Sequence, residues 1–71
     1  MPLVNVKLFK NEYSPEESEA LIKKITDVIV SFSGEQLRDA TWVVIEEVKD
    51  GQWGVGGNAL SLEDVREMQK S

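Results

Sequence analysis

The chain contains no cysteine and no histidine among its 71 residues. Without cysteine it can form neither disulfide bonds nor a thiolate metal site, and without histidine it lacks the usual general base and the commonest metal ligand. Basic residues are also few, because 8 lysines and arginines stand against 13 acids and leave a net charge of −5. This balance argues against a nucleic-acid or anionic-membrane partner, and we expect no metal and no cofactor.

Long apolar runs are absent as well. The apolar segment at residues 2–9 contains Asn5 and Lys7 and is too short for a signal peptide or a transmembrane helix, so we expect a cytoplasmic protein. The composition, with 41% hydrophobic and 30% charged residues, is typical of a globular domain rather than a disordered chain. A single core of this size seldom supplies more than about 3 to 5 kcal/mol, and we therefore expect the protein to oligomerise.

Two segments have the pattern of β-strands. Residues 3–9 alternate, with Val4, Val6 and Leu8 on one face and a half-apolar second face. Residues 41–48 are rich in β-branched and aromatic side chains, and their apolar residues fall on both faces. Both strands therefore need cover on two sides.

A helix is predicted between these strands, over residues 15–33. Ser14 can cap its first turn, a proline occupies the first helical position, and Glu17 is placed to close a capping box. Gly34 is a suitable residue to end it. The order strand, helix, strand predicts a right-handed βαβ unit with parallel strands. Because one helix covers only one face of a sheet, the other face requires a second chain, and two strands alone do not make a stable sheet.

The remaining residues complete a single domain, 1–71. The pair Asp50 and Gly51 predicts a tight turn of a hairpin that leads to Trp53, followed by a flexible loop at residues 54–57. Ser61 is a candidate cap for a short C-terminal helix. The predicted fold class is therefore α/β (α+β), with one βαβ unit and a short C-terminal hairpin.

Pro2 is the strongest candidate for a catalytic residue. If Met1 is removed, Pro2 becomes the N-terminus, and an α-amino group titrates near about 7.7 to 8.0 when nothing perturbs it. Burial beside apolar side chains disfavours the charged form, so such a secondary amine is able to act as a general base at neutral pH.

Pro2, the βαβ order and the segment GQWGVGG at residues 51–57 together resemble the tautomerase superfamily, and specifically its 4-oxalocrotonate tautomerase group. The resemblance implies that the N-terminal proline moves protons in the keto-enol isomerisation of 2-hydroxydienoates and related enol pyruvates. It also implies dimers that share a four-stranded sheet and assemble as a hexamer, a trimer of dimers. Trp53 matches the aromatic residue of the family loop, which lines the pocket and helps to keep the proline amine neutral.

The sequence departs from this family at two arginines that hold the substrate. Their positions fall on Glu12 or Tyr13 and on Trp42, and neither position carries an arginine. Tryptophan and tyrosine cannot copy the bidentate recognition of a carboxylate by guanidinium, so a dicarboxylate substrate is in doubt. Lysines and one arginine elsewhere are candidate replacements, and the predicted substrate-binding residues are Phe9, Lys10, Arg38, Trp42 and Trp53.

Three functions remain open on these residues. The first is a tautomerase that acts on a small substrate, for which the aromatic residues favour a flat monocarboxylate. The second is a related dehalogenase or hydratase of an unsaturated acid, in which Glu12 would be the residue that activates water. The third is a catalytically silent oligomeric relative. The sequence names neither the substrate nor the pathway, and does not decide between trimer and hexamer.

Overall fold

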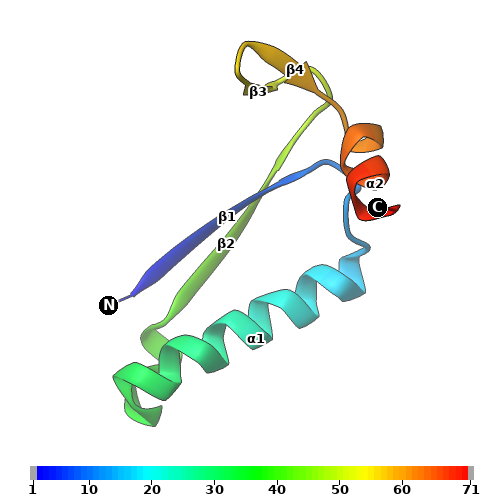
Figure 1. Cartoon of the computed structure of the whole chain (residues 1–71). Coiled ribbons are helices and arrows are strands. Elements are labelled where there is room, and N and C mark those ends of the chain that lie inside the picture. The colour runs from blue at the N-terminus through cyan, green and yellow to red at the C-terminus, as the bar shows by residue number, and fades with distance from the viewer. Residues whose placement is uncertain (1, 71) are drawn as a thin grey trace.

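The computed structural model describes residues 2–70, and Met1, whose removal is expected above, lies outside the described residues. The elements follow one another as β1 (Leu3–Phe9), α1 (Pro15–Ser33), a 3-10 helix η1 (Glu35–Ala40), β2 (Trp42–Val48), β3 (Trp53–Val55), β4 (Asn58–Leu60) and α2 (Leu62–Lys70). Figure 1 shows the chain ends far apart, with the N-terminus at the start of the long sheet and the C-terminus on α2. No helix in this part of the chain is long and apolar enough to cross a membrane.

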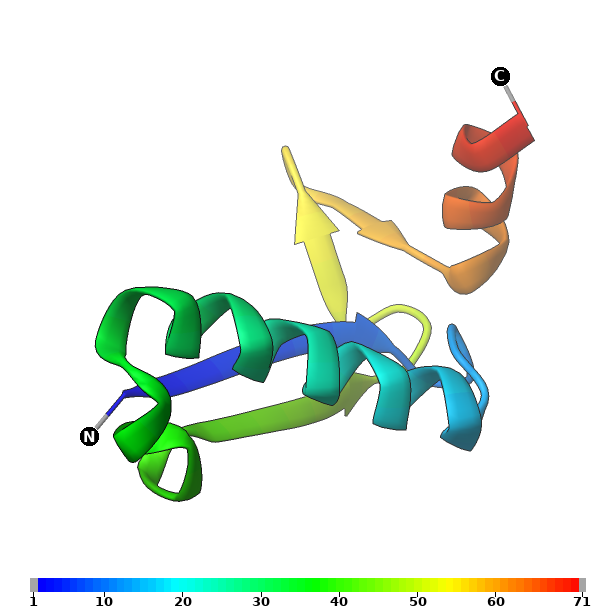
Figure 2. The same ribbon diagram turned by 90° about the horizontal axis from the view of Figure 1, so that it is seen from below.

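The predicted βαβ unit is confirmed. Strands β1 and β2 pair in parallel, in a register that runs from Leu3 opposite Trp42 to Phe9 opposite Val48. Helix α1 lies across one face of this two-stranded sheet (Figure 2). Val30 on α1 is 6% exposed and marks the small core between helix and strands.

Local signals account for the limits of α1. The Glu17 backbone N–H donates to Ser14 Oγ over 3.1 Å, and the Ser14 N–H donates to Glu17 Oε1 over 2.9 Å, which closes the capping box. At the other end Gly34 has a φ of 100°, a conformation that favours glycine, and its N–H donates to the Val30 carbonyl over 2.8 Å. The predicted helix is therefore confirmed with its bounds.

The strand pairing after β2 differs from the predicted one. The predicted hairpin from β2 through Asp50 and Gly51 to Trp53 is wrong, because β3 pairs antiparallel with β4 instead, with Val55 opposite Asn58. The two residues between these strands are the turn, and both have positive φ, 59° and 85°. Adjacent glycines suit a two-residue hairpin loop of this kind. The segment expected to be a loop is thus a strand and a turn, while the C-terminal hairpin and the C-terminal helix are confirmed.

The chain is extended and poorly buried. Its radius of gyration is 14.7 Å, whereas a compact domain of this length has about 11 Å. Its accessible surface is 5435 Å², against about 4,450 Å² for a typical monomer of this mass. Of the described hydrophobic residues only Phe9 and Val30 are buried, while Leu3 and Trp42 on the uncovered sheet face are 61% and 57% exposed. These dimensions fit a chain that leaves apolar surface for another copy to cover.

Candidate active site

Pro2 lies at the open end of the sheet, directly before β1. Its carbonyl accepts a hydrogen bond from the Trp42 backbone N–H over 3.0 Å, so the first residue of the described chain is fixed to the start of β2. Pro2 is half-buried, and its neighbours Leu3 and Trp42 are register partners on the uncovered face. Both side chains are more than half exposed, and the candidate base therefore stands beside an apolar surface.

Arg38, near the same end, already has two carboxylate partners. Its Nη1 lies 2.7 Å from Asp27 Oδ1, and its Nε lies 2.7 Å from Glu35 Oε1. Hydrogen bonds from Arg38 are the main reason why the pKa values of Asp27 and Glu35 are lowered from the ordinary range. The same bonds raise the pKa of Arg38 further above its usual value. The guanidinium thus joins η1 to α1, with its charge compensated within the chain.

The other end of β1 holds an aromatic pair. Phe9 is 3% exposed, and its ring stacks on that of Trp53 with centroids 4.9 Å apart and planes 24° from parallel. The Phe9 N–H donates to Glu12 Oε1 over 3.0 Å, and the Glu12 N–H donates to the Phe9 carbonyl over 3.0 Å. This closed turn fixes Phe9 and the loop after it, and β3 brings Trp53 onto the ring.

Lys10 lies next to this pair in a shallow depression of about 260 Å³, which is lined by Lys10, Asn11, Lys49, Asp50 and Leu62. The Lys10 N–H donates to the Val48 carbonyl over 2.8 Å, which continues the β1–β2 ladder by one residue. Within residues 2–70 neither Lys10 nor Lys49 has a carboxylate at ion-pair distance. Lys7, by contrast, lies 3.6 Å from Glu46, whose pKa is lowered by a hydrogen bond from Asn5 and by that lysine.

The predicted site residues therefore separate into two groups. Pro2, Trp42 and Arg38 lie at the start of the sheet, whereas Phe9, Lys10 and Trp53 lie at its end. A strand of seven residues rises about 3.3 Å per residue, so roughly 20 Å separates the two ends. Strand β3, which carries Trp53, lies far from the start of β1 (Figure 1), so a single chain does not bring the two groups together.

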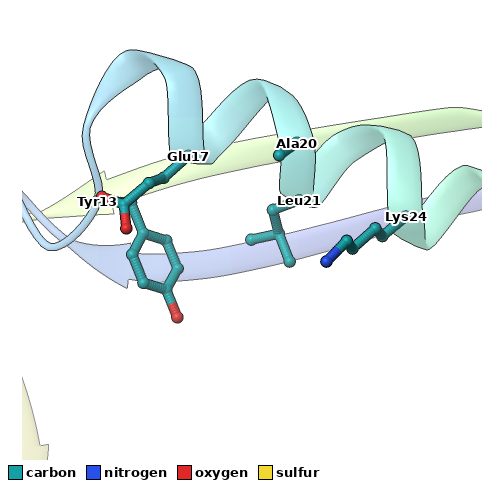
Figure 3. Close-up of a pocket in the computed structure, with 5 residues that line it drawn as sticks. All are labelled: Tyr13, Glu17, Ala20, Leu21 and Lys24. Carbon is teal, nitrogen blue, oxygen red and sulfur yellow. The ribbon is translucent and has the colours of Figure 1, made fainter.

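Two further features were not predicted from the sequence. The first is a depression of about 250 Å³ on α1, lined by Tyr13, Glu17, Ala20, Leu21 and Lys24. Figure 3 shows the side chains of Tyr13, Leu21 and Lys24 pointing to the same side of the helix. The available signal was the spacing i, i+3, i+4 and i+7 of Glu17, Ala20, Leu21 and Lys24, which places these four on one helical face, whereas Tyr13 precedes α1.

The second feature is Arg66 on α2. Its Nη2 donates to the Glu12 carbonyl over 2.6 Å, across 54 residues of sequence, and its Nη1 donates to Gln69 Oε1 over 3.3 Å. This contact ties the C-terminal helix to the loop that follows Phe9. No sequence signal indicated it, because the two residues meet only through the tertiary fold.

The sequence of the chain is similar to those of known proteins over most of its length. Residues 2–63 match the family described as tautomerase enzymes. The chain is 42% identical over 57 residues to the probable tautomerase SAR1376 of Staphylococcus aureus, a match that covers 80% of this chain and 90% of that protein. It is 33% identical over 61 residues to the probable tautomerase K2 of Dickeya dadantii, covering 86% and 90% of the two chains.

Solved structures of relatives share the fold. The crystal structure of SAR1376 from methicillin-resistant S. aureus superposes with a TM-score of 0.72 at 40% identity, covering 82% of this chain and 90% of that one. TomN, described as a 4-oxalocrotonate tautomerase homologue in the tomaymycin biosynthetic pathway, gives a TM-score of 0.74 at 31% identity. That match covers 99% of this chain and 97% of TomN, so it extends over α2.

Proposed function

The chain belongs to the tautomerase family, and we propose that it is a cofactor-independent isomerase with Pro2 as its proton-transfer group. The substrate we propose is a 2-hydroxydienoate or an enol pyruvate. Once Met1 is removed, the neutral proline amine takes the proton of the enol hydroxyl, and the resulting cation returns a proton to the substrate carbon. One proton leaves oxygen and one reaches carbon, so the step needs no redox partner.

The observation that carries this proposal is the placement of Pro2. The residue directly precedes β1, its backbone is fixed by the bond from Trp42, and the side chains of Leu3 and Trp42 beside it are apolar and exposed. A positioned amine beside apolar side chains suits general acid-base catalysis at neutral pH. The chain has no histidine that could take this part instead.

The two separated groups of site residues support a pocket shared between copies. A two-fold axis perpendicular to the sheet makes the strands of two copies antiparallel, which places the Phe9 end of one chain beside Pro2 of the other. Trp53 of the second copy then provides the aromatic wall that Pro2 lacks in its own chain. The expected hexamer would be a trimer of such dimers.

The face of α1 in Figure 3 fits the same symmetry. Glu17 and Lys24 stand equally far on either side of Ala20 and Leu21, and all four line one depression. When two copies of α1 pack antiparallel about this centre, each Glu17 lies opposite the Lys24 of the other copy. A two-fold interface is self-complementary in this sense.

We further propose a flat monocarboxylate such as phenylenolpyruvate as a better substrate than 2-hydroxymuconate. Arg38 is compensated by Asp27 and Glu35, and a second carboxylate without a cation is costly to desolvate beside tryptophan. Direct binding by Arg38 and Lys10 stays a prediction. For the hydratase alternative, the Glu12 carboxylate already accepts the Phe9 N–H, and nothing in the geometry favours it over the tautomerase.

The test is an ultraviolet assay of both enol substrates with protein whose intact mass shows that Met1 is absent. We expect Pro2→Ala to lower kcat/KM at least about 100-fold, as for a positioned acid-base group. Pro15→Ala is the matched control, since this exposed proline only begins α1, and its turnover should stay near that of the parent. Unchanged turnover in Pro2→Ala would remove proline from the mechanism, and no turnover of any enol substrate by processed protein would favour the silent alternative.

A further inference from the structure

The two arginines of the chain differ in what they contact. Arg38 binds the carboxylates of Asp27 and Glu35. Among the described residues, Arg66 donates to neutral acceptors, the Glu12 backbone carbonyl and the Gln69 side-chain amide oxygen. Within the described residues no carboxylate lies at ion-pair distance from Arg66. The positive charge of Arg66 is thus uncompensated at short range, although the chain as a whole carries a net charge of −5.

This arginine is also partly removed from water. Arg66 is half-buried, and its hydrogen bond to the Glu12 carbonyl is partly shielded from solvent. Removing a charge from water is costly unless an opposite charge or enough hydrogen bonds replace the water. A guanidinium has five N–H donors in a rigid fork, and the structure provides two acceptors for them. The remaining donors favour an anionic ligand that can accept two parallel hydrogen bonds, which is the geometry of a carboxylate.

The position of Arg66 relates it to the aromatic pair. Glu12, whose carbonyl receives the guanidinium, is bonded through both its backbone N–H and its carboxylate to Phe9. Phe9 in turn stacks on Trp53. The closed turn from Phe9 to Glu12 therefore links the guanidinium of Arg66 to the stacked rings of Phe9 and Trp53. A ligand that binds at this end of the sheet with a planar apolar body and one carboxylate would match both groups.

We propose that Arg66 binds the carboxylate of the substrate, while Trp53 contacts its planar part. This inference rests on the proposed function, because only that function makes the bound carboxylate a substrate. It deepens that function by assigning the specificity-determining cation to α2, which begins at the edge of the family match at residues 2–63 and carries Arg66 beyond it. Arg66 sets substrate affinity and orientation, and Pro2 of another copy moves the proton.

The experiment measures binding and turnover separately. Binding of cinnamate, a flat monocarboxylate, and of cinnamamide, its uncharged analogue, is measured by calorimetry in the Pro2→Ala background, where catalysis plays no part. We expect Arg66→Gln to weaken cinnamate binding about 10- to 100-fold, the scale of a charge-assisted hydrogen-bond pair, and to leave cinnamamide binding nearly unchanged. Arg66→Lys should fall between, because lysine keeps the charge but loses the fork.

Lys70→Gln is the matched control on the same helix, since Lys70 is exposed and pairs with Glu67. It should bind cinnamate as the parent does. In the Pro2-containing enzyme, Arg66→Gln should raise KM for phenylenolpyruvate more than it lowers kcat. Circular dichroism shows whether α2 remains folded in each variant. If α2 unfolds in Arg66→Gln, the cinnamate and cinnamamide affinities of Arg66→Lys are used to test the proposal instead.

The proposal is overturned if the variant that keeps α2 folded binds cinnamate like the parent, or if it loses cinnamate and cinnamamide equally. An equal loss of affinity for both compounds is the result expected if Arg66 only holds the loop after Phe9 in place. The outcome is independent of the proposed proline chemistry. A Pro2→Ala enzyme with full turnover, together with Arg66-dependent cinnamate binding, would refute the mechanism while it supports the carboxylate site.

Discussion

The two ends of the β1–β2 sheet are built differently. At the end that begins with Pro2, the outer face exposes Leu3 and Trp42, and the nearby arginine is compensated by acids. At the other end Phe9 is buried under Trp53, and the nearby arginine is held only by neutral acceptors. One end thus carries the proposed proton-transfer group without an aromatic pocket wall, and the other carries an aromatic and cationic surface without a candidate base.

Under the proposed function, this difference explains how a chain of 71 residues would form its active site together with a second copy. Each end supplies what the other lacks, and an antiparallel arrangement of two copies places unlike ends together at two equivalent sites. Assembly then covers apolar surface and completes the sites in the same step. The small core of the single chain agrees with this proposal, in which stability and activity would both depend on the contact between copies.

The largest expected effect tests whether the two ends cooperate across chains. Pro2→Ala and Trp53→Ala should each be strongly impaired when assayed alone. When the two variants are unfolded together and refolded as a mixture, mixed dimers contain one site with both parent residues. About a quarter of all sites should then be intact in a random 1:1 mixture, and activity should recover to about that fraction of the parent.

Its control is each variant refolded alone and mixed afterwards without unfolding, which should show no recovery if subunit exchange is slow. Additive residual activity in the co-refolded mixture would contradict a shared site. It would place Pro2 and Trp53 in unrelated parts of the molecule.

The sequence predicts the first half of the fold better than the second for a physical reason. The bounds of β1 and α1 follow from alternation and from the Ser14–Glu17 capping box, which are interactions among near neighbours. The hairpin was misplaced because Asp50–Gly51 and Gly56–Gly57 are both good turn sequences. Which of them joins paired strands depends on tertiary contacts such as the Gly51 N–H to the Leu60 carbonyl, 2.9 Å long.

The candidate site was predictable only as a set of residue types. Pro2 and Trp53 could be identified from their local sequence, but their separation by the length of β1 follows from the parallel register. Likewise, the charge of Arg38 could be counted, yet its compensation by Asp27 becomes visible only when η1 folds back on α1. Arg66 was missed because its partner Glu12 lies in another segment of the chain.

The second prediction sharpens the contrast between the two arginines through pH. In the folded chain Arg38 lowers the pKa values of Asp27 and Glu35 below their ordinary 3.8 and 4.5. A carboxylate with a lowered pKa contributes stability above its unfolded pKa and loses it as the pH falls through the folded value. Arg38→Gln should therefore have a lower Tm than the parent at pH 6, and the difference should shrink below about pH 4.

Thermal denaturation of both proteins between about pH 2 and pH 7 provides the measurement. A difference in Tm that stays constant over this range would show that Arg38 acts through packing rather than through its ion pairs. If Arg38→Gln raises KM for phenylenolpyruvate as strongly as Arg66→Gln does, then both arginines bind substrate, and the contrast drawn between the two ends is wrong.

The smallest expected effect concerns the α1 face that would join the copies. Lys24→Glu places two acids opposite each other at both ends of the proposed antiparallel helix pair, and exposed ion pairs contribute only about 0.2 to 1 kcal/mol each. Because symmetry doubles the change, the dimer dissociation constant should rise on the order of 10-fold at low salt and less at high salt. Adding Glu17→Gln removes the repulsion but keeps a residue able to close the capping box, so the double variant should recover most of the affinity. Analytical ultracentrifugation at two salt concentrations measures this, and if Lys24→Glu associates like the parent at both, α1 does not pack against its own copy through this face.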